Sequence, residues 1–382
     1  MAARANLAAL GKEDVILSGE PEVTYFVERY KGHTPFAQRV DTVQFQADYV
    51  YFGAESYSVL PRSGDLISKM YLKINFPVNL LGTTVVVRDS VATLMIDYVE
   101  LYIGARLVER FWGEFLALKW DLEVPQSKQG ALTGLIGKGT QTAASSYTVP
   151  LPFSILKKGL PICAFQEDVT IRLGLHPSTV FTSPATTISP SLDVNIDVEY
   201  TYLSEPEVKF IQSKPLLYIF EQLQKNEFFA PKGVNAITCP LTIINSVKEM
   251  YLAIQNDSAS GYDYSNVANG TTDQLSNLVM FFNSTDRISA DVGTPIFLRN
   301  IQALEFHTRI PQYLFYMYSF SLDPESDQPT GHVNFSRIDQ KNLVLNLNAS
   351  TANRYITVYA LSYNFLAVGN ATADVIFKNY IS

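Results

Sequence analysis

The feature that most constrains the fold of this chain is an alternation of side-chain character with a period of two residues. Leu343, Leu345 and Leu347 are separated by single residues, and apolar or aromatic residues occupy every second position from Leu314 to Leu322. Successive side chains of a strand point to opposite faces of a sheet, so this alternation is typical of strands with one buried face. Prolines and glycines lie between the alternating runs, where turns are expected.

The alternating runs predict eight strands in each half of the chain. The predicted strands of the first half are residues 40–47, 56–60, 66–76, 84–88, 96–109, 148–152, 169–175 and 192–203. Those of the second half are residues 228–230, 236–244, 248–255, 278–282, 313–322, 332–338, 343–347 and 355–365. Eight strands suit one jelly roll, and the abundance of aromatic, Val, Ile and Thr residues also favours sheets. The two halves share no obvious residue-level repeat.

Two helices and one exposed loop are predicted between the strands. Apolar residues at helical spacing predict a helix over residues 111–122, at the edge of a sandwich. Residues 126–146 are rich in Gly, Ser, Thr and Gln, which predicts an exposed loop. A Thr-Pro pair is typical of a helix start and predicts a helix over residues 294–306.

The predicted strands and breaks divide the chain into four parts. Residues 1–25 are predicted to be an N-terminal arm and residues 26–204 a first jelly roll. Residues 205–224 contain two prolines and mixed charges, and they are predicted to be a linker with a short helix. Residues 225–382 are predicted to be a second jelly roll.

Composition limits the classes of function. Charged residues make up 17% of the chain, below the roughly 25% of an ordinary domain. Two explanations stay open: surfaces covered by neighbouring chains, and a large core. The formal net charge of −8 argues against direct nucleic-acid binding, which needs clustered Lys and Arg. The two cysteines, Cys163 and Cys239, are too few for a disulfide framework and predict free thiols in a reducing compartment.

No group of residues predicts a catalytic, cofactor-binding or metal site, and the chain is predicted not to be an enzyme. The histidines are scattered and have no neighbouring set of further ligands; they are His33, His176, His307 and His332. His307 is predicted to lie at the start of a strand. Glu325 and Asp327 are interpreted as solvated charges in a loop, and residues 134–140 resemble a phosphate loop only superficially.

Six Asn-x-Ser/Thr sequences occur, all in the second half of the chain. Asn256, Asn269 and Asn283 are the candidate glycosylation acceptors, because the first two lie in a polar loop and the third follows a strand. The remaining three begin at Asn334, Asn348 and Asn370. Chance occurrence in an Asn-rich half is the alternative, because glycosylation in the secretory pathway needs lumenal exposure.

Residues 318–339 read YSFSLDPESDQPTGHVNFSRID, an alternating strand, proline and glycine turns, and a second strand. This stretch resembles the C-terminal signature of the major capsid proteins of the nucleocytoplasmic large DNA viruses. Further blocks resemble motifs of that family in the same order: residues 33–37 (HTPFA), 62–67 (RSGDLI), 99–104 (VELYIG), 160–165 (LPICAF), 221–224 (EQLQ), 245–249 (NSVKE) and 363–366 (YNFL). His332 and Val333 depart from the family pattern, which usually has Thr-Cys there.

The resemblance implies an all-β fold of two tandem eight-stranded jelly rolls with short helical insertions in loops. It implies a major capsid protein that assembles as trimeric, pseudohexagonal capsomers into an icosahedral virus shell. The implied partners are two further copies of the chain, neighbouring capsomers, minor capsid and penton proteins and, indirectly, an internal viral membrane. The resemblance implies no cofactor, small-molecule substrate or direct nucleic-acid contact. The implied location is the virion, with assembly in the host cytoplasm.

Two alternative functions stay open on the sequence. The first is a minor or paralogous double jelly-roll capsid protein, which copy number in the virion would distinguish. The second is a β-sandwich glycan-binding protein, in which exposed aromatic residues such as Tyr262 and Tyr264 would stack on sugars.

Overall fold

The chain divides into two units, Met1–Phe36 and Ala37–Ser382. The computed structural model describes residues 4–5, 8–9, 11–20, 32–46, 50–76, 85–139, 146–188, 192–257, 261–262, 264 and 272–377. In the first unit, helix α2 (Lys12–Ser18) follows Gly11, whose backbone N–H donates to Asp14 Oδ2 at 2.8 Å. None of the residues of α2 is buried. The two sandwiches described below lie in the second unit.

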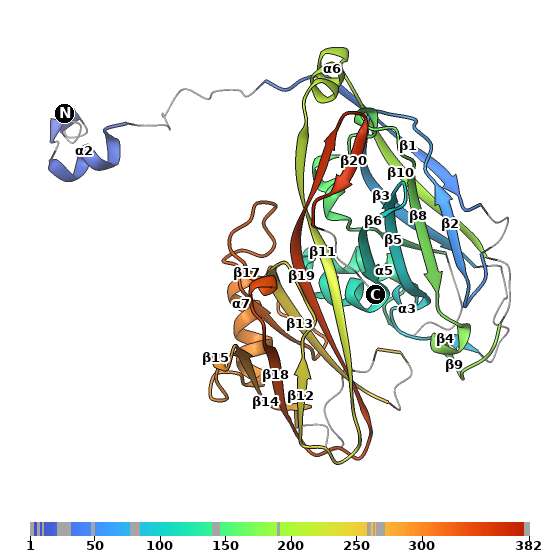
Figure 1. Ribbon diagram of the computed structural model, residues 1–382, viewed down its shortest axis with the longest axis vertical. Helices are drawn as coiled ribbons and strands as arrows, with labels where there is room; N and C mark the ends of the chain where they lie inside the picture. The colour runs from blue at the N-terminus through green and yellow to red at the C-terminus, as the bar shows by residue number, and fades with distance from the viewer. Residues whose placement is uncertain are drawn as a thin grey trace. The chain divides into compact units, whose positions relative to one another are not determined.

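The first jelly roll is formed by strands from the first half of the chain. They are β1 (Phe36–Gln44), β2 (Glu55–Val59), β3 (Leu66–Asn75), β5 (Ile96–Ile103), β6 (Arg106–Trp112), β7 (Tyr147–Pro150), β8 (Val169–Leu175) and β10 (Asp193–Leu203). They form two four-stranded sheets with the orders β1-β10-β3-β7 and β2-β8-β5-β6 (Figure 1).

The second jelly roll repeats this arrangement. Its strands are β11 (Leu216–Ala230), β12 (Ala236–Pro240), β13 (Ser246–Asn256), β14 (Leu275–Phe282), β15 (Thr285–Ile288), β16 (Tyr316–Ser319), β18 (Lys341–Leu347) and β19 (Arg354–Gly369). The sheet orders are β11-β19-β13-β16 and β12-β18-β14-β15. Two short strands extend the first of these sheets, because β17 (Val333–Asn334) pairs with β13 and β20 (Thr372–Val375) pairs with β19.

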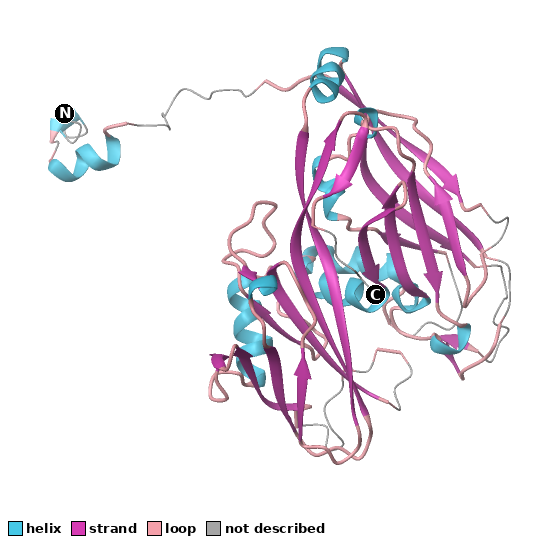
Figure 2. Cartoon of the chain, viewed as in Figure 1, coloured by secondary structure: helices cyan, strands magenta, loops and turns pink. Residues whose placement is uncertain are grey.

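The two rolls have the same topology. When the eight strands of each roll are numbered in chain order, one sheet of each roll has the order 1-8-3-6 and the other has the order 2-7-4-5. Helices are inserted between the fifth and sixth strands of both rolls (Figure 2). They are α4 (Gly113–Glu123) and α5 (Gln126–Ile136) in the first roll, and the π-helix η4 (Ile296–Ile301) continued by α7 (Gln302–Phe306) in the second. The predicted fold class, a double jelly roll with helical insertions, is confirmed.

A short sequence repeat coincides with this topology. Met70-Tyr71-Leu72 lies in β3 and Met250-Tyr251-Leu252 in β13, and each of these strands is the third of its roll. In both strands the Met and Leu side chains are buried in their own roll while the Tyr side chain takes the opposite face. This match of three residues becomes recognisable only when the strands are matched by their position in the two rolls.

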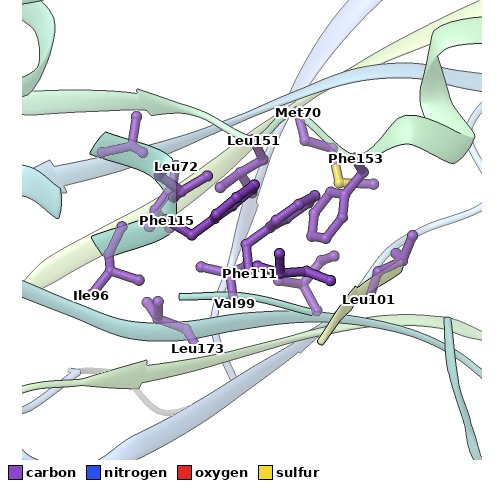
Figure 3. Close-up of a cluster of buried hydrophobic side chains, with 14 of the residues drawn as sticks. Met70, Leu72, Ile96, Val99, Leu101, Phe111, Phe115, Leu151, Phe153 and Leu173 are labelled. Carbon is purple, nitrogen blue, oxygen red and sulfur yellow. The ribbon is translucent and has the colours of Figure 1, made fainter. Parts of the chain in front are cut away.

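The core of the first roll lies between its two sheets (Figure 3). Figure 3 shows Met70 and Leu72 of β3 on one side, with Val99, Leu101 and Leu173 of the facing sheet on the other. All five of these side chains are buried. The alternation in β3 explains this placement, because every second side chain of the strand enters the core.

The 1-8-3-6 sheet of the second roll is buried on both faces. On one face, residues such as Leu252 and Val358 fill the core of the second roll. On the opposite face, Tyr251, Tyr359 and Leu361 pack with the core of the first roll. As a result, β13 and β19 carry long runs of buried residues in place of a strict alternation. This shared sheet joins the two rolls.

Short elements connect the principal strands. They are β4 (Val86–Val87), α3 (Val91–Met95), η1 (Ser154–Lys158), η2 (Ile162–Ala164), η3 (Ser178–Val180), β9 (Thr182–Ser183), α6 (Glu205–Ser213) and η5 (Phe335–Arg337). Among the described residues, no helix is both long enough and apolar enough to cross a membrane.

Several strand predictions were wrong in detail. The predicted strand over residues 96–109 is the hairpin β5–β6, which turns at Gly104 in the left-handed region with φ of 58°. The predicted strand over residues 84–88 is only the two-residue β4, which pairs with β9 outside the sandwiches. The short and mostly exposed β15 was missed, because its TDRI sequence carries little apolar periodicity.

The region around the signature is less regular than its alternation predicted. The strand expected over residues 313–322 is β16, which ends at Ser319, and Leu322 is 80% exposed. The strand expected over residues 332–338 is the two-residue β17 followed by the turn of η5. The strand ends at Ser319, although the alternation of apolar residues continues to Leu322.

The helix predictions were also only partly correct. The helix predicted over residues 111–122 starts at Gly113, since Phe111 and Trp112 belong to β6, and it is buried rather than at a sandwich edge. The loop predicted over residues 126–146 contains helix α5, in which the Gln129 side chain donates to Trp120 O and Val124 O. Those contacts stabilise a helix that its glycines disfavour. The helix predicted over residues 294–306 is confirmed.

The domain limits predicted from the sequence stay a prediction. Within the predicted linker, residues 205–224, the structure has helix α6 and the first residues of β11. Ser204 begins α6 with a capping box, in which the Glu207 carboxylate accepts from Ser204 N at 3.4 Å. The Ser204 hydroxyl also donates to that carboxylate, at 2.9 Å.

Gly113, the first residue of α4, allows the helix to start against the backbone of α3 and β5. A Cβ at this position would lie 2.1 Å from Thr93 O and 2.3 Å from Ile96 O. We therefore expect Gly113→Ala to lower the free energy of unfolding by about 1–3 kcal/mol, as overpacking does. The control is Gly130→Ala in α5, where no atom lies within 4 Å of the added Cβ and alanine favours the helix. Urea unfolding measures both, and equal stability of the two variants would contradict the expectation.

Candidate functional site

The signature loop, which we define as residues 323–331, is closed by hydrogen bonds within itself. Asp323 Oδ1 accepts from the backbone N–H groups of Glu325 and Ser326, both at 3.1 Å. Thr330 Oγ1 accepts from Asp323 N at 2.9 Å and donates to Asp323 O at 2.8 Å. The Asp and Thr of the signature therefore shape the turn, as expected of side chains that bond nearby backbone.

A buried lysine holds the loop against the sheet below it. Lys248 Nζ donates to Pro324 O at 2.7 Å and lies 2.6 Å from Glu221 Oε1. Lys248 is 1% exposed, so its charge is offset by this carboxylate and this carbonyl in place of water. Burial by itself would raise the pKa of Glu221, but the charges of Lys248 and Lys119 outweigh it and lower the pKa.

A buried histidine makes the second attachment of the loop. His307 Nδ1 lies 3.0 Å from Glu325 Oε1, and its Nε2 lies 3.3 Å from Glu249 Oε2. The same Glu325 carboxylate accepts from Thr308 N at 2.9 Å. The side chain of His307 is fully buried, and it therefore bridges a carboxylate of the loop and a carboxylate of β13.

The electrostatics of this bridge favour charged partners. Burial by itself would lower the pKa of His307, but Glu249 and Glu325 raise it to about 9. Burial would raise the pKa of Glu249, but the charge of His307 outweighs it and lowers the pKa to about 2. The pKa of Glu325 is also lowered, since the bonds from His307 and Thr308 outweigh its burial. The cluster is therefore a cation held between two carboxylates at neutral pH.

Three blocks that are far apart in the sequence meet at this loop. Glu221 belongs to EQLQ, Lys248 and Glu249 belong to NSVKE, and Glu325 belongs to the signature. The same EQLQ block also joins the rolls, because Gln222 Nε2 donates to Val108 O of the first roll at 2.9 Å. Three of the blocks that carry the family resemblance thus meet in one structural cluster, which we call the signature cluster.

The signature cluster corrects two sequence interpretations. His307 was expected at the start of a strand, but it follows α7 at the C-terminal end of that helix. Glu325 was interpreted as a solvated charge, but it is partly buried and paired. Asp327 does remain largely exposed and lies 3.0 Å from Lys157 Nζ. No sequence signal joined His307 to Glu249, because 57 intervening residues separate groups that only the folded sheet brings together.

Helix α4 carries further charged groups into the contact between the rolls. Asp121 Oδ2 accepts from Tyr313 N at 2.8 Å, and Arg309 lies 3.2 Å from Asp121 Oδ1. Glu114 Oε2 accepts from the Tyr359 hydroxyl at 2.6 Å. These contacts pair buried polar groups across the two rolls, which is the condition under which burying them is tolerated.

A buried carboxyl of β6 marks the same junction. Glu109 accepts from the backbone N–H groups of Ser154 and Ile155, at 2.9 and 2.8 Å. Burial outweighs these bonds and raises the pKa of Glu109 to about 8. The Ser154 hydroxyl in turn accepts from Glu221 N at 2.6 Å, so the chain of contacts reaches the second roll.

The described residues contain no group of three or more His, Cys, Asp and Glu side chains that could hold a metal ion. The predicted absence of catalytic, cofactor and metal residues stays a prediction. Cys163 and Cys239 are free thiols. An open depression of about 390 Å³ adjoins His307 and is lined by Glu305, Asp323 and Glu325 among others.

The candidate glycosylation acceptors lie in different surroundings. Asn283 is exposed in the β14–β15 turn, where its Oδ1 accepts from Gln340 N at 3.0 Å. Asn256 is partly buried at the end of β13, and its Oδ1 accepts from Gln274 Nε2 at 3.1 Å. Asn269 lies outside the described residues.

Comparison with known families covers almost the whole chain. The model described as "Large eukaryotic DNA virus major capsid protein" matches residues 207–373. The model described as "Major capsid protein N-terminus" matches residues 24–208. The chain is 25% identical to the major capsid protein of Pyramimonas orientalis virus, with 98% of each chain covered. It is 23% identical to the major capsid protein of Phaeocystis pouchetii virus, with 98% and 99% covered.

Solved structures share the fold at lower identity. A chain of the quasi-atomic model of the PBCV-1 virus capsid matches with a TM-score of 0.78 and 18% identity, covering 93% of this chain and 100% of that one. The Faustovirus major capsid protein matches with a TM-score of 0.74 and 10% identity, covering 96% of both chains. These likenesses speak to the fold alone.

Removal of Lys248 tests whether the signature loop depends on its buried cation. We expect Lys248→Met to lower the free energy of unfolding by about 3–5 kcal/mol, because Glu221 would stay buried without its partner. The matched control is Lys209→Met, which breaks the exposed pair with Glu205 on α6 and is expected to change stability little. Urea unfolding checks both, and the expectation fails if the two variants lose the same stability.

The pH dependence of stability tests the bridge of His307. Its folded pKa of about 9 lies above the unfolded value of 6.5, so its contribution is complete below pH 6.5 and is lost as the pH rises through about 9. Between these limits the free energy of unfolding of the natural chain should fall by about 1.4 kcal/mol per pH unit more than that of His307→Gln. Replacement of the exposed His332 by Gln should leave the natural slope. Parallel curves for the natural chain and His307→Gln would contradict this role.

Proposed function

This chain belongs to the family of large eukaryotic DNA virus major capsid proteins, and we propose that three copies of it assemble into a capsomer of pseudohexagonal outline. The family is one of structural capsid proteins rather than of enzymes, and its members are components of the virion capsid. Neighbouring capsomers then form the icosahedral shell. Minor capsid and penton proteins complete the proposed partners.

The observation that carries this proposal is the identical topology of the two rolls. Each roll has one 1-8-3-6 sheet, one 2-7-4-5 sheet and a helical insertion between strands 5 and 6. Three chains therefore supply six similar sandwiches, and closed threefold symmetry would arrange them as an approximate hexagon. The rolls are joined by a doubly buried sheet and by polar contacts, so each chain contributes its two sandwiches as one compact unit.

The charge of the chain supports a shell that does not touch the genome directly. The formal net charge is −8, and direct binding of nucleic acid relies on clustered Lys and Arg. We propose that an internal membrane lies between the shell and the DNA. Two free cysteines fit assembly in the reducing host cytoplasm.

Two alternatives weigh less. A minor or paralogous capsid protein would have the same fold and would be distinguished by a low copy number in purified virions. The glycan-binding alternative relied on Tyr262 and Tyr264, but Tyr264 is 3% exposed and donates to Glu114 Oε1 at 2.8 Å. Tyr262 stacks on that ring, with centroids 6.2 Å apart. Tyr264 is therefore engaged within the fold rather than offered as an open stacking surface.

Among the candidate glycosylation acceptors, we propose Asn283. Asn283 is the described candidate with an exposed side chain, whereas Asn256 is partly buried. Mass spectrometry of protein from virions would detect a sugar on the peptide that contains Asn283.

Electron microscopy of the purified full chain tests the capsomer. We expect threefold particles of pseudohexagonal outline, with a mass in solution of three times the 42.7 kDa of one chain. Light scattering provides the mass independently of the images. A chain that remains monomeric at high concentration would count against the proposal.

A further inference from the structure

The insertion helices of the two rolls differ in how they are covered. In α4 nearly every residue from Gly113 to Leu122 is buried. In the equivalent helix of the second roll, Ile296 and Leu304 are each 67% exposed and Ile301 is 42% exposed. We call this surface, Ile296, Ile301 and Leu304, the open helix face. Their spacing of five residues in the π-helix and three residues into α7 favours one side of the helix, and exposed apolar patches commonly mark an interface.

The covered helix shows what such an insertion packs against. Phe115 of α4 contacts Tyr251 of β13 edge to face, with centroids 5.3 Å apart, and Tyr359 of β19 at 5.5 Å. Glu114 adds the bond to the Tyr359 hydroxyl. Tyr251 and Tyr359 are partners across strands 3 and 8 of the second roll. The insertion helix of one roll thus covers the outward face of the 1-8-3-6 sheet of the other.

The equivalent sheet face of the first roll is less covered by the residues that the structure describes. Tyr71 occupies the position of Tyr251 in the Met-Tyr-Leu repeat, and its partner in strand 8 is Asp197. Tyr71 is partly exposed, whereas Tyr251 is fully buried. Val40 of β1 lies on the same face, because the neighbouring Thr42 hydroxyl reaches Asp197 Oδ1 at 2.7 Å, and Val40 is exposed. We call this surface the open sheet face; it consists of Val40, Thr42, Lys69, Tyr71, Lys73, Asp197 and Glu199.

We propose that the open helix face of one copy of the chain packs on the open sheet face of a neighbouring copy, in the same way that α4 packs on β13 and β19 within the chain. The proposal rests on the trimer proposed above and names its contact. Figure 1 shows α7 and β10 on opposite sides of the Ala37–Ser382 unit, so one chain cannot close this contact by itself. A contact between two different faces, repeated head to tail, closes a ring of three chains when the rotation is 120°.

The chemistry of the two faces predicts a contact weaker than the one within the chain. Around Tyr71 the open sheet face carries the ion pairs of Lys73 with Asp197 and of Lys69 with Glu199. At the equivalent place Tyr251 meets Tyr359, which is apolar apart from its hydroxyl. The contact between chains is therefore a small apolar centre with a charged surround, the usual composition of an interface between separately folded chains.

Cross-linking of engineered thiols tests the proposed contact in the full chain. The variant carries Tyr71→Cys and Leu304→Cys, with the partly exposed Cys163 replaced by Ser. A short bismaleimide should join these thiols between copies and give covalent trimers on a denaturing gel. Tyr71→Cys and Leu304→Cys as single changes are the controls, and neither should give covalent trimers, because like positions do not meet in a head-to-tail ring.

The outcomes separate this inference from the capsomer proposal. If light scattering shows that the double variant is a trimer but the bismaleimide does not join its chains, the proposed contact is wrong, whereas the proposal of a trimeric capsomer is not affected. Monomers in the natural chain would overturn both. As a second measurement, Leu304→Glu should raise the trimer dissociation constant at least tenfold, whereas Leu322→Glu, at a leucine that is even more exposed and lies outside both faces, should not. Equal effects of the two substitutions would also overturn the contact.

Discussion

The doubly buried sheet β11-β19-β13-β16 is the constraint on which the rest of the structure depends. One of its faces completes the core of the second roll, and the other packs with the core of the first. A sheet that is apolar on both sides cannot face water, so the second roll is stable only with a neighbour across that face. In this chain the neighbour is α4 with the end of β6. The two rolls are therefore energetically one body, although each has the topology of a complete sandwich.

Burying that face also buries charges, and those that hold the signature loop are placed beside groups of opposite charge. Lys248 is matched by Glu221 and a loop carbonyl, and His307 is matched by Glu249 and Glu325. Paired buried charges contribute little net stability compared with apolar residues, but an unpaired one is costly. Apolar contacts alone would allow the two rolls to pack in several ways, and such charge pairs favour the one packing in which each charge meets its partner. The signature loop is the element that completes the set, which gives a physical reason for its Asp, Pro and Glu without any catalytic role.

Features that depend on neighbouring residues in the sequence were predicted better than features that depend on contacts between distant segments. Alternation located most strands, because the side-chain period of a strand is local, and the buried Leu343, Leu345 and Leu347 lie where it put them. Alternation failed at Leu322, which lies beyond the end of its strand. Composition failed in α5, where contacts of the Gln129 side chain with the end of α4 favour a helix. The signature cluster was not predictable as a site. Its blocks were recognised one by one, but their meeting depends on strand register across more than a hundred residues.

The sequence by itself determined the strand-rich composition, the local turns, the family and the shortage of charge. These follow from propensity, periodicity and residue type, each readable within a short window. Only the tertiary structure decided that the halves share one strand order, that Tyr71 and Tyr251 are equivalent, and that one insertion helix is covered while the other is open. Those facts depend on which strands pair and which faces meet. Pairing is a property of the whole chain, because the free energy of burying a face is gained only when its partner is in place.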